Sequence, residues 1–126
     1  MYEVTTITSF SGAHNLRDYK GKCENLHGHN WKIEATVCGE NLDKTGMLLD
    51  FTELKKIVGG LLEGFDHQYL NKVKPFDKLN PTSEIMAKYI HDELKGRLLC
   101  EHPKLELSGI KITVWESDRQ YAVYHE

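Results

Sequence analysis

The chain has 126 residues, of which 40 % are apolar and 28 % charged, a balance typical of one globular domain and not of a disordered segment or a membrane span. The net charge of -3 disfavours nucleic acid as a partner, because a duplex-binding surface needs a basic excess. The start of the sequence lacks the features of a secretory signal, and the three cysteines have no paired spacing. We therefore expect a single domain over residues 1–126 in the cytoplasm, with no membrane partner.

Two strands are expected first. Residues 2–10 are rich in Val, Thr, Ile and aromatic residues, which favour strands. Residues 30–38 alternate strictly, so that the apolar residues from Trp31 to Val37 point to one face and polar residues to the other. A polar loop over residues 15–27 joins the two strands.

Two helices are expected next. Asp50 and Glu53 form a capping box at the start of the first helix, and Asn80–Glu84 is a helix-start signature for the second. Each helix carries an apolar stripe with a period of about 3.6 residues. The stripes are Phe51, Leu54, Val58, Leu61, Leu62 and Phe65, and then Ile85, Met86, Tyr89, Ile90, Leu94 and Leu98.

After Pro103 the apolar residues alternate again from Leu105 to Val114, and a turn at Ser117–Asp118 precedes a last strand over residues 120–124. The order strand, strand, helix, helix, strand, strand predicts an α+β fold, a four-stranded antiparallel sheet with both helices on one face. The other sheet face carries polar residues but also Trp115, and an open sheet has two unpaired edges. We therefore expect sheets of several subunits to join.

Three histidines have the spacing of metal ligands. His27 and His29 are two residues apart at the start of a predicted strand, so both imidazoles point to the same face. His14 lies just after the first strand, and an antiparallel pairing would bring it close to them. Three imidazoles with one open position are typical of a catalytic zinc ion. The alternative is that His27 and His29 are polar loop residues and His14 a core histidine.

Other residues are candidates for proton transfer. Cys23 precedes His27 by four residues, and a thiol near a metal becomes a competent base; alone it is an ordinary cysteine. Its neighbour Glu24 is a second proton-transfer candidate or a solvated carboxylate. Asp66 and His67 follow the first helix and form either a carboxylate-oriented imidazole or a polar helix exit.

Glu116 continues the apolar parity of the strand that precedes it, where an unpaired carboxylate would be costly. It either receives N–H donors of a ligand or lies in a frayed strand end. The remaining histidines are expected at the surface: His91, His102 and His125.

Several short stretches, in order along the chain, resemble the 6-pyruvoyltetrahydropterin synthase / 6-carboxytetrahydropterin synthase family. They are Phe10–His14, Cys23–His29, Leu49–Phe51, Phe65–His67 with Leu70–Asn71, Asn80–Glu84 and Val114–Ser117. The resemblance implies the tunnelling fold (T-fold), with trimeric barrels stacked as a homohexamer. Such an assembly would account for the mixed character of the second sheet face.

The resemblance also implies roles for individual residues. It makes His14, His27 and His29 the ligands of Zn²⁺. Cys23 matches the catalytic base, and Asp66 and His67 match its proton-relay partners. Glu116 matches the carboxylate that anchors the 2-amino and N3 edge of a pterin, and Thr82 is expected to contact the substrate. From charge alone, Arg17, Lys20 and Lys22 are candidates to bind a triphosphate, or belong to a solvated loop.

The spacing Cys-x-x-x-His-Gly-His is similar to that of the queuosine-pathway enzyme, a lyase that converts 7,8-dihydroneopterin triphosphate to 6-carboxy-5,6,7,8-tetrahydropterin, acetaldehyde and triphosphate. The pyruvoyl-forming enzyme carries a longer insertion there. Glu24 resembles the glutamate of a folate-pathway subfamily that forms 6-hydroxymethyl-7,8-dihydropterin, so either or both activities are implied. Outside the family, a three-histidine zinc hydrolase and a non-catalytic binding module remain as alternatives.

Overall fold

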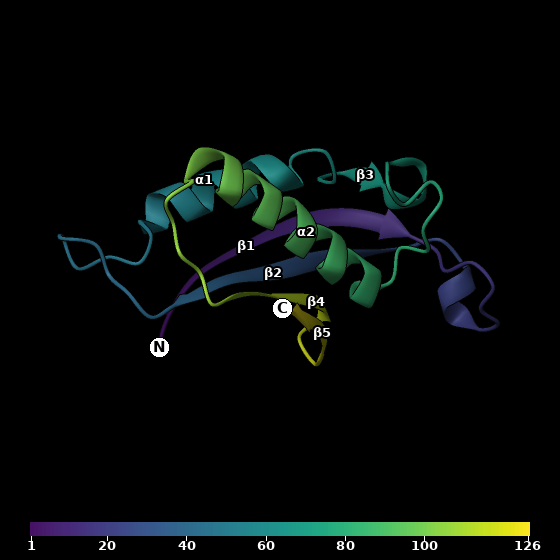
Figure 1. Cartoon of the computed structure of the whole chain (residues 1–126). Coiled ribbons are helices and arrows are strands. Elements are labelled where there is room, and N and C mark those ends of the chain that lie inside the picture. The colour runs from purple at the N-terminus through teal and green to yellow at the C-terminus, as the bar shows by residue number, and fades with distance from the viewer.

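The computed structural model describes all 126 residues as a curved sheet with two helices on one face (Figure 1). Five strands form the sheet in the order β3-β1-β2-β4-β5. They are β1 (Tyr2–His14), β2 (His27–Gly39), β3 (Gln68–Tyr69), β4 (Gly109–Ser117) and β5 (Gln120–His125). The helices are α1 (Phe51–Leu62) and α2 (Ser83–Glu101), with short 3-10 turns at Lys22–Glu24 and Leu70–Lys72.

The predicted α+β order and the antiparallel pairing of four strands are confirmed. The prediction of four strands was incomplete, because β3 adds two residues that pair in parallel with β1 at Gly12 and Ala13. A two-residue strand has no periodicity to detect. The segment from Leu105 to Ser108 forms no strand, although its alternation suggested one.

Both N-terminal strands are longer than predicted, and the extra residues matter for function. β1 continues from Phe10 to His14, and β2 begins at His27 instead of Asn30. In this antiparallel pair His14 lies opposite His27 at one end of the sheet, and Tyr2 lies opposite Gly39 at the other. The three histidines, predicted at the start of the second strand and just after the first, are therefore all held by strand backbone.

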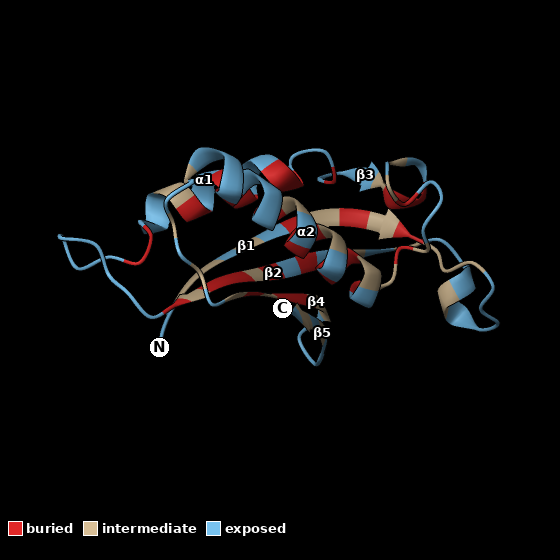
Figure 2. Ribbon diagram, in the orientation of Figure 1, coloured by how far each residue is buried: buried red, intermediate tan, exposed pale blue.

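The hydrophobic core lies between the helices and the sheet (Figure 2). The two predicted helix stripes supply nine of its 23 residues, and Ile85 and Tyr89 pack against it partly buried, but Phe51 is 66 % exposed. As the first residue of α1, Phe51 lies at the end of the helix, beside the exposed apolar residues Leu42 and Met47. Its inclusion in the buried stripe was wrong.

His91 also differs from its prediction. It is 1 % exposed, and its ring packs edge-on against Tyr124 of β5 with ring centroids 4.8 Å apart. The Nδ1 atom lies 3.0 Å from a carboxylate oxygen of Asp92. His91 points to the sheet because α2 crosses β5 as well as β4.

Neither helix has the length and apolar character that crossing a membrane requires.

The sheet face away from the helices is mixed in character, as expected. Thr36 and Thr113 are buried there, and Trp115 is partly buried. The indole N–H of Trp115 donates to Glu34, and the Lys32 ammonium lies 4.3 Å from the centre of the Trp115 ring. This face thus combines aromatic and charged groups.

Candidate metal centre

The pairing of β1 with β2 brings three histidines together, as the sequence predicted. His14 lies opposite His27, and His29 lies opposite Gly12. His27 and His29 have the same parity as the buried Trp31, so their imidazoles lie on the helix-covered face. The paired backbones of β1 and β2 therefore fix the positions from which the three imidazoles extend.

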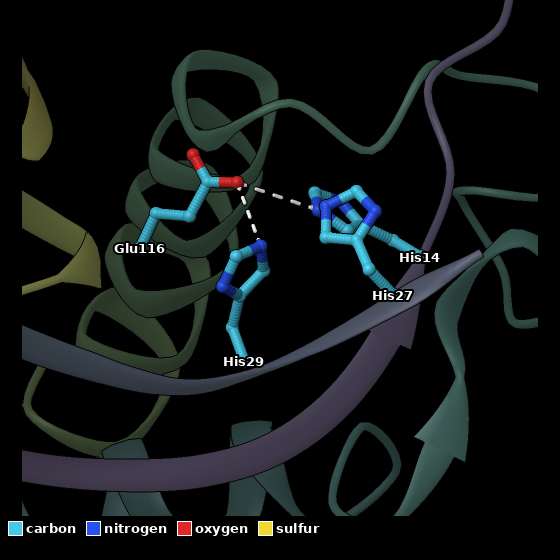
Figure 3. A group of neighbouring side chains, drawn as sticks. All are labelled: His14, His27, His29 and Glu116. Carbon is cyan, nitrogen blue, oxygen red and sulfur yellow. Dashed lines mark ion pairs between the residues drawn. The ribbon is translucent and has the colours of Figure 1, made fainter. Parts of the chain in front are cut away.

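The three imidazoles and one carboxylate converge on a common space (Figure 3). The centroid of the His14 ring lies 4.5 Å from that of His27 and 5.2 Å from that of His29. The centroids of the His27 and His29 rings are 4.8 Å apart. With Glu116, they each offer one ligand atom, and these four atoms all lie within 4.8 Å of one another. We call this set the histidine cluster.

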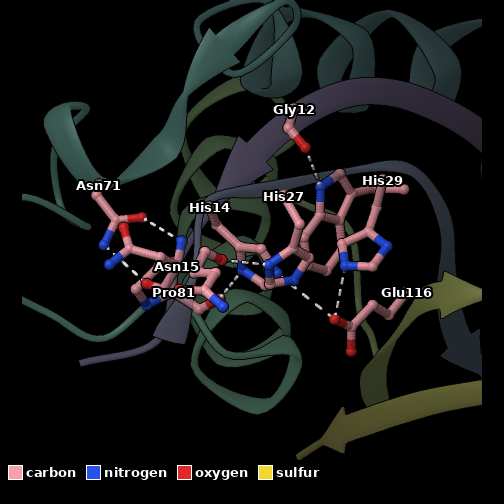
Figure 4. Close-up of polar contacts among 10 residues, drawn as sticks. Gly12, His14, Asn15, His27, His29, Asn71, Pro81 and Glu116 are labelled. Atoms are coloured by element: carbon pink, nitrogen blue, oxygen red, sulfur yellow. Dashed lines mark hydrogen bonds and ion pairs between the residues drawn. The ribbon is translucent and has the colours of Figure 1, made fainter. Parts of the chain in front are cut away.

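Backbone carbonyls fix the orientation of two rings (Figure 4). His14 Nδ1 lies 2.8 Å from the carbonyl oxygen of Pro81, and His27 Nδ1 lies 2.7 Å from that of Asn25. A carbonyl only accepts, so each Nδ1 carries the proton and donates it, which leaves each Nε2 with a free lone pair. Neither carbonyl partner was recognisable from the sequence.

The Nε2 atom of His14 is buried and forms no hydrogen bond, whereas the buried Nε2 atom of His29 has only the Glu116 carboxylate beside it, at 2.9 Å. The whole His14 side chain is only 2 % exposed, and an orphaned buried nitrogen is costly. A divalent cation bound at these nitrogens would satisfy them. The donor set therefore fits a metal such as zinc.

Electrostatics also favour the metal-binding form of the imidazoles. Burial lowers the pKa of His14 from its ordinary value of 6.5, and the nearby His27 and His29 lower it further. Burial likewise lowers the pKa of His29, against an opposing effect of the Glu116 carboxylate. Both rings are then neutral at pH 7, as metal coordination requires.

Glu116 lies on the face that its parity predicted, within β4 and not in a frayed end. Its Oε1 is 2.9 Å from His29 Nε2 and 3.5 Å from His14 Nε2. The side chain is 30 % exposed, so it also reaches the outside of the cluster. A carboxylate in this place could ligate a metal or accept hydrogen bonds from a ligand beside it.

Trp31 forms one wall of the cluster, a role that sequence reasoning missed. Its ring packs edge-on against His14 at 4.9 Å and His29 at 5.2 Å between centroids, and it is fully buried. The indole N–H donates to the carbonyl oxygen of Gly12 at 3.2 Å. The only sequence signal was the shared parity of these residues in one strand.

Cys23 and Glu24 lie in the 3-10 turn between β1 and β2, outside the histidine cluster. The Cys23 side chain is half-buried, whereas Glu24 is exposed. The Leu16 N–H donates to the Cys23 carbonyl at 2.8 Å, which ties this turn to the chain just after β1. The loop thus keeps the thiol near the end of the sheet that carries the cluster.

Asp66 and His67 form the carboxylate–imidazole pair that was one of the two sequence interpretations. His67 Nδ1 lies 3.0 Å from Asp66 Oδ1. The Ser11 N–H donates to the same oxygen at 3.0 Å and is the main reason that the pKa of Asp66 is lowered, with His67 adding to it. In return, the His67 N–H donates to the Ser11 carbonyl at 2.6 Å.

His67 is 81 % exposed and has a φ of 58°, a conformation that turns the chain from α1 towards β3. Within this chain His67 and His29 lie on opposite sides of β1, because His67 directly precedes β3 and His29 belongs to β2. His67 and His29 nevertheless line one open hollow of about 550 Å³, together with Ser11, Gly28 and Gln68.

The structure gives Arg17 a role other than the one charge suggested. Its guanidinium donates to the carbonyl oxygens of Leu79, Asn71 and Phe76 at 2.9, 3.1 and 2.7 Å, so it is a structural side chain and not a free cation. Thr82 is the N-cap of α2, and its hydroxyl oxygen accepts from the Ile85 N–H at 3.2 Å. A substrate contact for Thr82 stays a prediction.

A second group of donors lies at the opposite end of the sheet. Glu53, Glu101 and His102 each place a ligand atom within 4.8 Å of the others, and His102 Nε2 lies 3.5 Å from Glu53 Oε2. They come from the first turn of α1 and the end of α2. We call this set the helix-end cluster; the His102 side chain is 29 % exposed and thus only partly at the surface.

Comparisons with known proteins agree with this fold. The sequence matches the family model described as 6-pyruvoyl tetrahydropterin synthase over residues 3–126. It is 33 % identical over 128 residues to the 6-carboxy-5,6,7,8-tetrahydropterin synthase of Bacillus subtilis, with 98 % of this chain and 84 % of the relative covered. It is 38 % identical over 110 residues to the dihydroneopterin monophosphate aldolase of Pyrococcus furiosus, with 87 % and 85 % covered.

A solved structure supports the same conclusion. Caenorhabditis elegans 6-pyruvoyl tetrahydropterin synthase aligns with a TM-score of 0.83 and 32 % sequence identity, covering 98 % of this chain and 94 % of that one. The names of these relatives differ in the product formed, so they identify the family and not one reaction. The chain belongs to the 6-pyruvoyl tetrahydropterin synthase family and has its T-fold.

Proposed function

We propose that this chain is a zinc-dependent 6-carboxy-5,6,7,8-tetrahydropterin synthase, a cytoplasmic lyase of queuosine biosynthesis that acts on 7,8-dihydroneopterin triphosphate. The observation that carries the proposal is the histidine cluster, in which four ligand atoms converge and the buried Nε2 atom of His14 forms no hydrogen bond. The relatives from Bacillus subtilis and Haemophilus influenzae that bear this enzyme's name cover most of the chain.

In this proposal His14, His27 and His29 bind zinc through Nε2, because their ligand atoms converge and burial lowers the pKa of His14 and His29. When bound, the zinc ion supplies Lewis acidity to hydroxyl oxygens of the substrate side chain. Trp31 excludes water from the inner side of the cluster, where it packs against two of the three rings. The open side faces the surface, through which the substrate enters.

Cys23 Sγ is the proposed base that removes a proton from the substrate side chain. A thiolate is a good base when a nearby positive charge stabilises it. Asp66 keeps the His67 Nδ1 proton in place through their 3.0 Å contact, which leaves Nε2 to receive and return a proton. The exposure of His67 suits a relay that works at a surface or between subunits.

Glu116 is the proposed anchor of the pterin ring. An ionised carboxylate has two acceptor oxygens, and the 2-amino and N3 edge of a pterin offers two N–H donors, so the pair is bidentate. Glu116 lies beside His14 and His29, which would place the substrate side chain next to the metal.

A second activity is supported by two specific observations. Glu24 is exposed directly beside Cys23, and a relative with 38 % identity is named a dihydroneopterin monophosphate aldolase. We propose that Glu24 can serve as the proton-transfer group for cleavage to 6-hydroxymethyl-7,8-dihydropterin. The 6-pyruvoyltetrahydropterin product is the third possibility within the family.

Product analysis tests these proposals. The zinc-loaded protein is incubated with dihydroneopterin triphosphate or with dihydroneopterin, and the pterins are identified by mass spectrometry. We expect 6-carboxytetrahydropterin from the triphosphate, loss of this product in Cys23→Ala, and loss of any hydroxymethylpterin in Glu24→Ala. Full activity of Cys23→Ala on a hydrolysable ester would favour the zinc hydrolase, and binding without turnover a non-catalytic module.

We further propose a homohexamer built from two trimers. Most of β1 has a free edge, since β3 pairs only with Gly12 and Ala13, and β5 forms the other edge. The apolar side chains Ile7 of β1 and Val123 of β5 are 60 % and 42 % exposed, as expected of strands that pair between subunits. Light scattering that finds only a monomer would contradict this assembly.

A further inference from the structure

Two asparagine side chains bind the backbone that follows β1. Asn71 Oδ1 accepts from the Asn15 N–H at 3.0 Å, and its Nδ2 donates to the Asn15 carbonyl at 2.9 Å. Asn80 repeats this pairing two residues later: its Oδ1 accepts from the Arg17 N–H at 2.9 Å, and its Nδ2 donates to the Arg17 carbonyl at 3.1 Å. The two carboxamides thus act as a strand would, pairing with alternate residues.

The Arg17 side chain completes the attachment from the other direction. It donates to the carbonyls of Asn71, Phe76 and Leu79, which lie along the segment between Asn71 and Asn80. The Tyr69 hydroxyl adds a bond of 2.6 Å to the Asn15 carboxamide oxygen. We call the side chains of Arg17, Asn71 and Asn80 the 71–81 clamp, because together they fix residues 71–81 against residues 15–17.

The clamp acts directly beside a proposed metal ligand, and Figure 4 shows its Asn71 side chain at Asn15, next to His14. His14 immediately precedes Asn15, and Pro81 immediately follows Asn80. The Pro81 carbonyl is the group that accepts the Nδ1 proton of His14 at 2.8 Å. The clamp therefore holds both partners of this hydrogen bond, one on each side.

We propose that the 71–81 clamp positions the ligand His14. By fixing the Pro81 carbonyl, it keeps the imidazole in the orientation and tautomer in which Nε2 faces the cluster. The inference rests on the proposed zinc site, but it assigns a function to Arg17, Asn71 and Asn80 that is separate from substrate binding. These are positioning residues, since none of them is among the four donors of the cluster.

Zinc affinity, measured by competition with a chromophoric chelator and without substrate, tests this inference. We expect Asn71→Ala and Asn80→Ala each to weaken zinc binding about 10- to 100-fold, the usual effect of losing support behind a metal ligand. Arg17→Lys keeps the charge but cannot reach three carbonyls, and we expect it to weaken zinc binding as well. An Arg17 that bound only triphosphate would leave zinc affinity unchanged.

A second readout follows the His14 ring itself. In the metal-free wild type, nitrogen NMR should show His14 protonated at Nδ1, whereas the clamp variants should show a mixture of tautomers. Asn41→Ala removes an exposed asparagine outside the clamp and controls for the loss of an asparagine side chain as such. Val58→Ala weakens the core on α1 and controls for a loss of stability.

The outcomes separate the clamp from the zinc site. If clamp variants bind zinc as tightly as Val58→Ala at a matched melting temperature, and keep the wild-type tautomer, the clamp is only structural and the inference is overturned. If the wild type itself binds no zinc, the proposed metal site fails and this inference fails with it.

Discussion

The histidine cluster and the helix-end cluster look alike as groups of donors but differ in how the chain holds them. In each, the ligand atoms lie within 4.8 Å of one another. The histidines come from paired strands, and two of them donate Nδ1–H to backbone carbonyls. The helix-end residues come from two helix ends, and the Glu53 and His102 side chains are 41 % and 29 % exposed. Proximity alone thus does not distinguish a metal site from neighbouring surface charges.

The difference lies in preorganisation. The Nε2 atoms of His14 and His102 are both buried without a hydrogen-bond partner, but the two side chains are held differently. His14 is 2 % exposed and is oriented by the Pro81 carbonyl, whereas His102 is 29 % exposed at the end of a helix. The carboxylates of the helix-end cluster can be solvated or can move apart at little cost. Zinc should therefore bind far more tightly at the histidine cluster than at the helix-end cluster.

Removing ligands should give the largest effect. We expect His27→Ala and His29→Ala to weaken zinc affinity by more than about 100-fold, beyond the usual effect of changes behind a ligand, and to abolish pterin turnover. Glu53→Ala and His102→Ala are the matched changes in the helix-end cluster and should leave both unchanged. Isothermal titration with zinc measures this, and equal losses from the two clusters would end the distinction.

Glu116→Gln should separate a pterin anchor from a fourth ligand. Loss of a charge-assisted hydrogen bond costs about 1.5–3 kcal/mol, so KM for the pterin should rise about 10- to 100-fold. Zinc affinity should change much less than in His27→Ala. If instead Glu116→Gln loses zinc as completely as the histidine variants, Glu116 is a metal ligand and the site is closed.

Lowering the pH should reduce the free energy of unfolding of the metal-free protein, because His14 and His29 of the histidine cluster take up protons less readily when folded. The pKa values of His14 and His29 are lowered in the folded state, so the unfolded chain takes up protons first as the pH falls below about 6.5. The stability contributed by these neutral rings is present above that pH and decreases below it, by up to about 1.4 kcal/mol per pH unit for each ring. Urea unfolding between pH 8 and pH 5 measures this slope, and the double variant His14→Gln/His29→Gln should flatten it.

The smallest effect should come from the helix cap beside the helix-end cluster. Asp50 accepts from the Thr52 N–H at 2.8 Å at the start of α1. Asp50→Ala should lower the free energy of unfolding by about 1 kcal/mol and leave zinc affinity unchanged. A change in zinc affinity would show that the two ends of the molecule are coupled.

Much of the fold followed from periodicity, because long strands and amphipathic helices repeat their pattern many times. The signal failed where few residues were involved: β3 has two, and Phe51 occupies a helix end where the stripe no longer faces the sheet. His91 looked like a surface residue because its burial depends on β5, a strand far away in the sequence.

The histidine cluster was predictable because strand parity and antiparallel pairing are local rules. The contacts that hold the cluster in place could not be predicted. The Pro81 carbonyl and the carboxamide of Asn71 reach residues 14 and 15 from more than 50 positions away, and no pattern marks such contacts. Arg17 shows the same limit: charge suggested a phosphate, but three backbone carbonyls occupy its guanidinium.

X-ray absorption at the zinc edge of the purified, zinc-loaded protein tests the central claim most directly. The account predicts one zinc per chain, with a shell of nitrogen and oxygen at about 2.0–2.2 Å that includes three imidazoles. His27→Ala should lose one imidazole from this shell. A sulfur shell at about 2.3 Å, or no stoichiometric zinc at all, would contradict it.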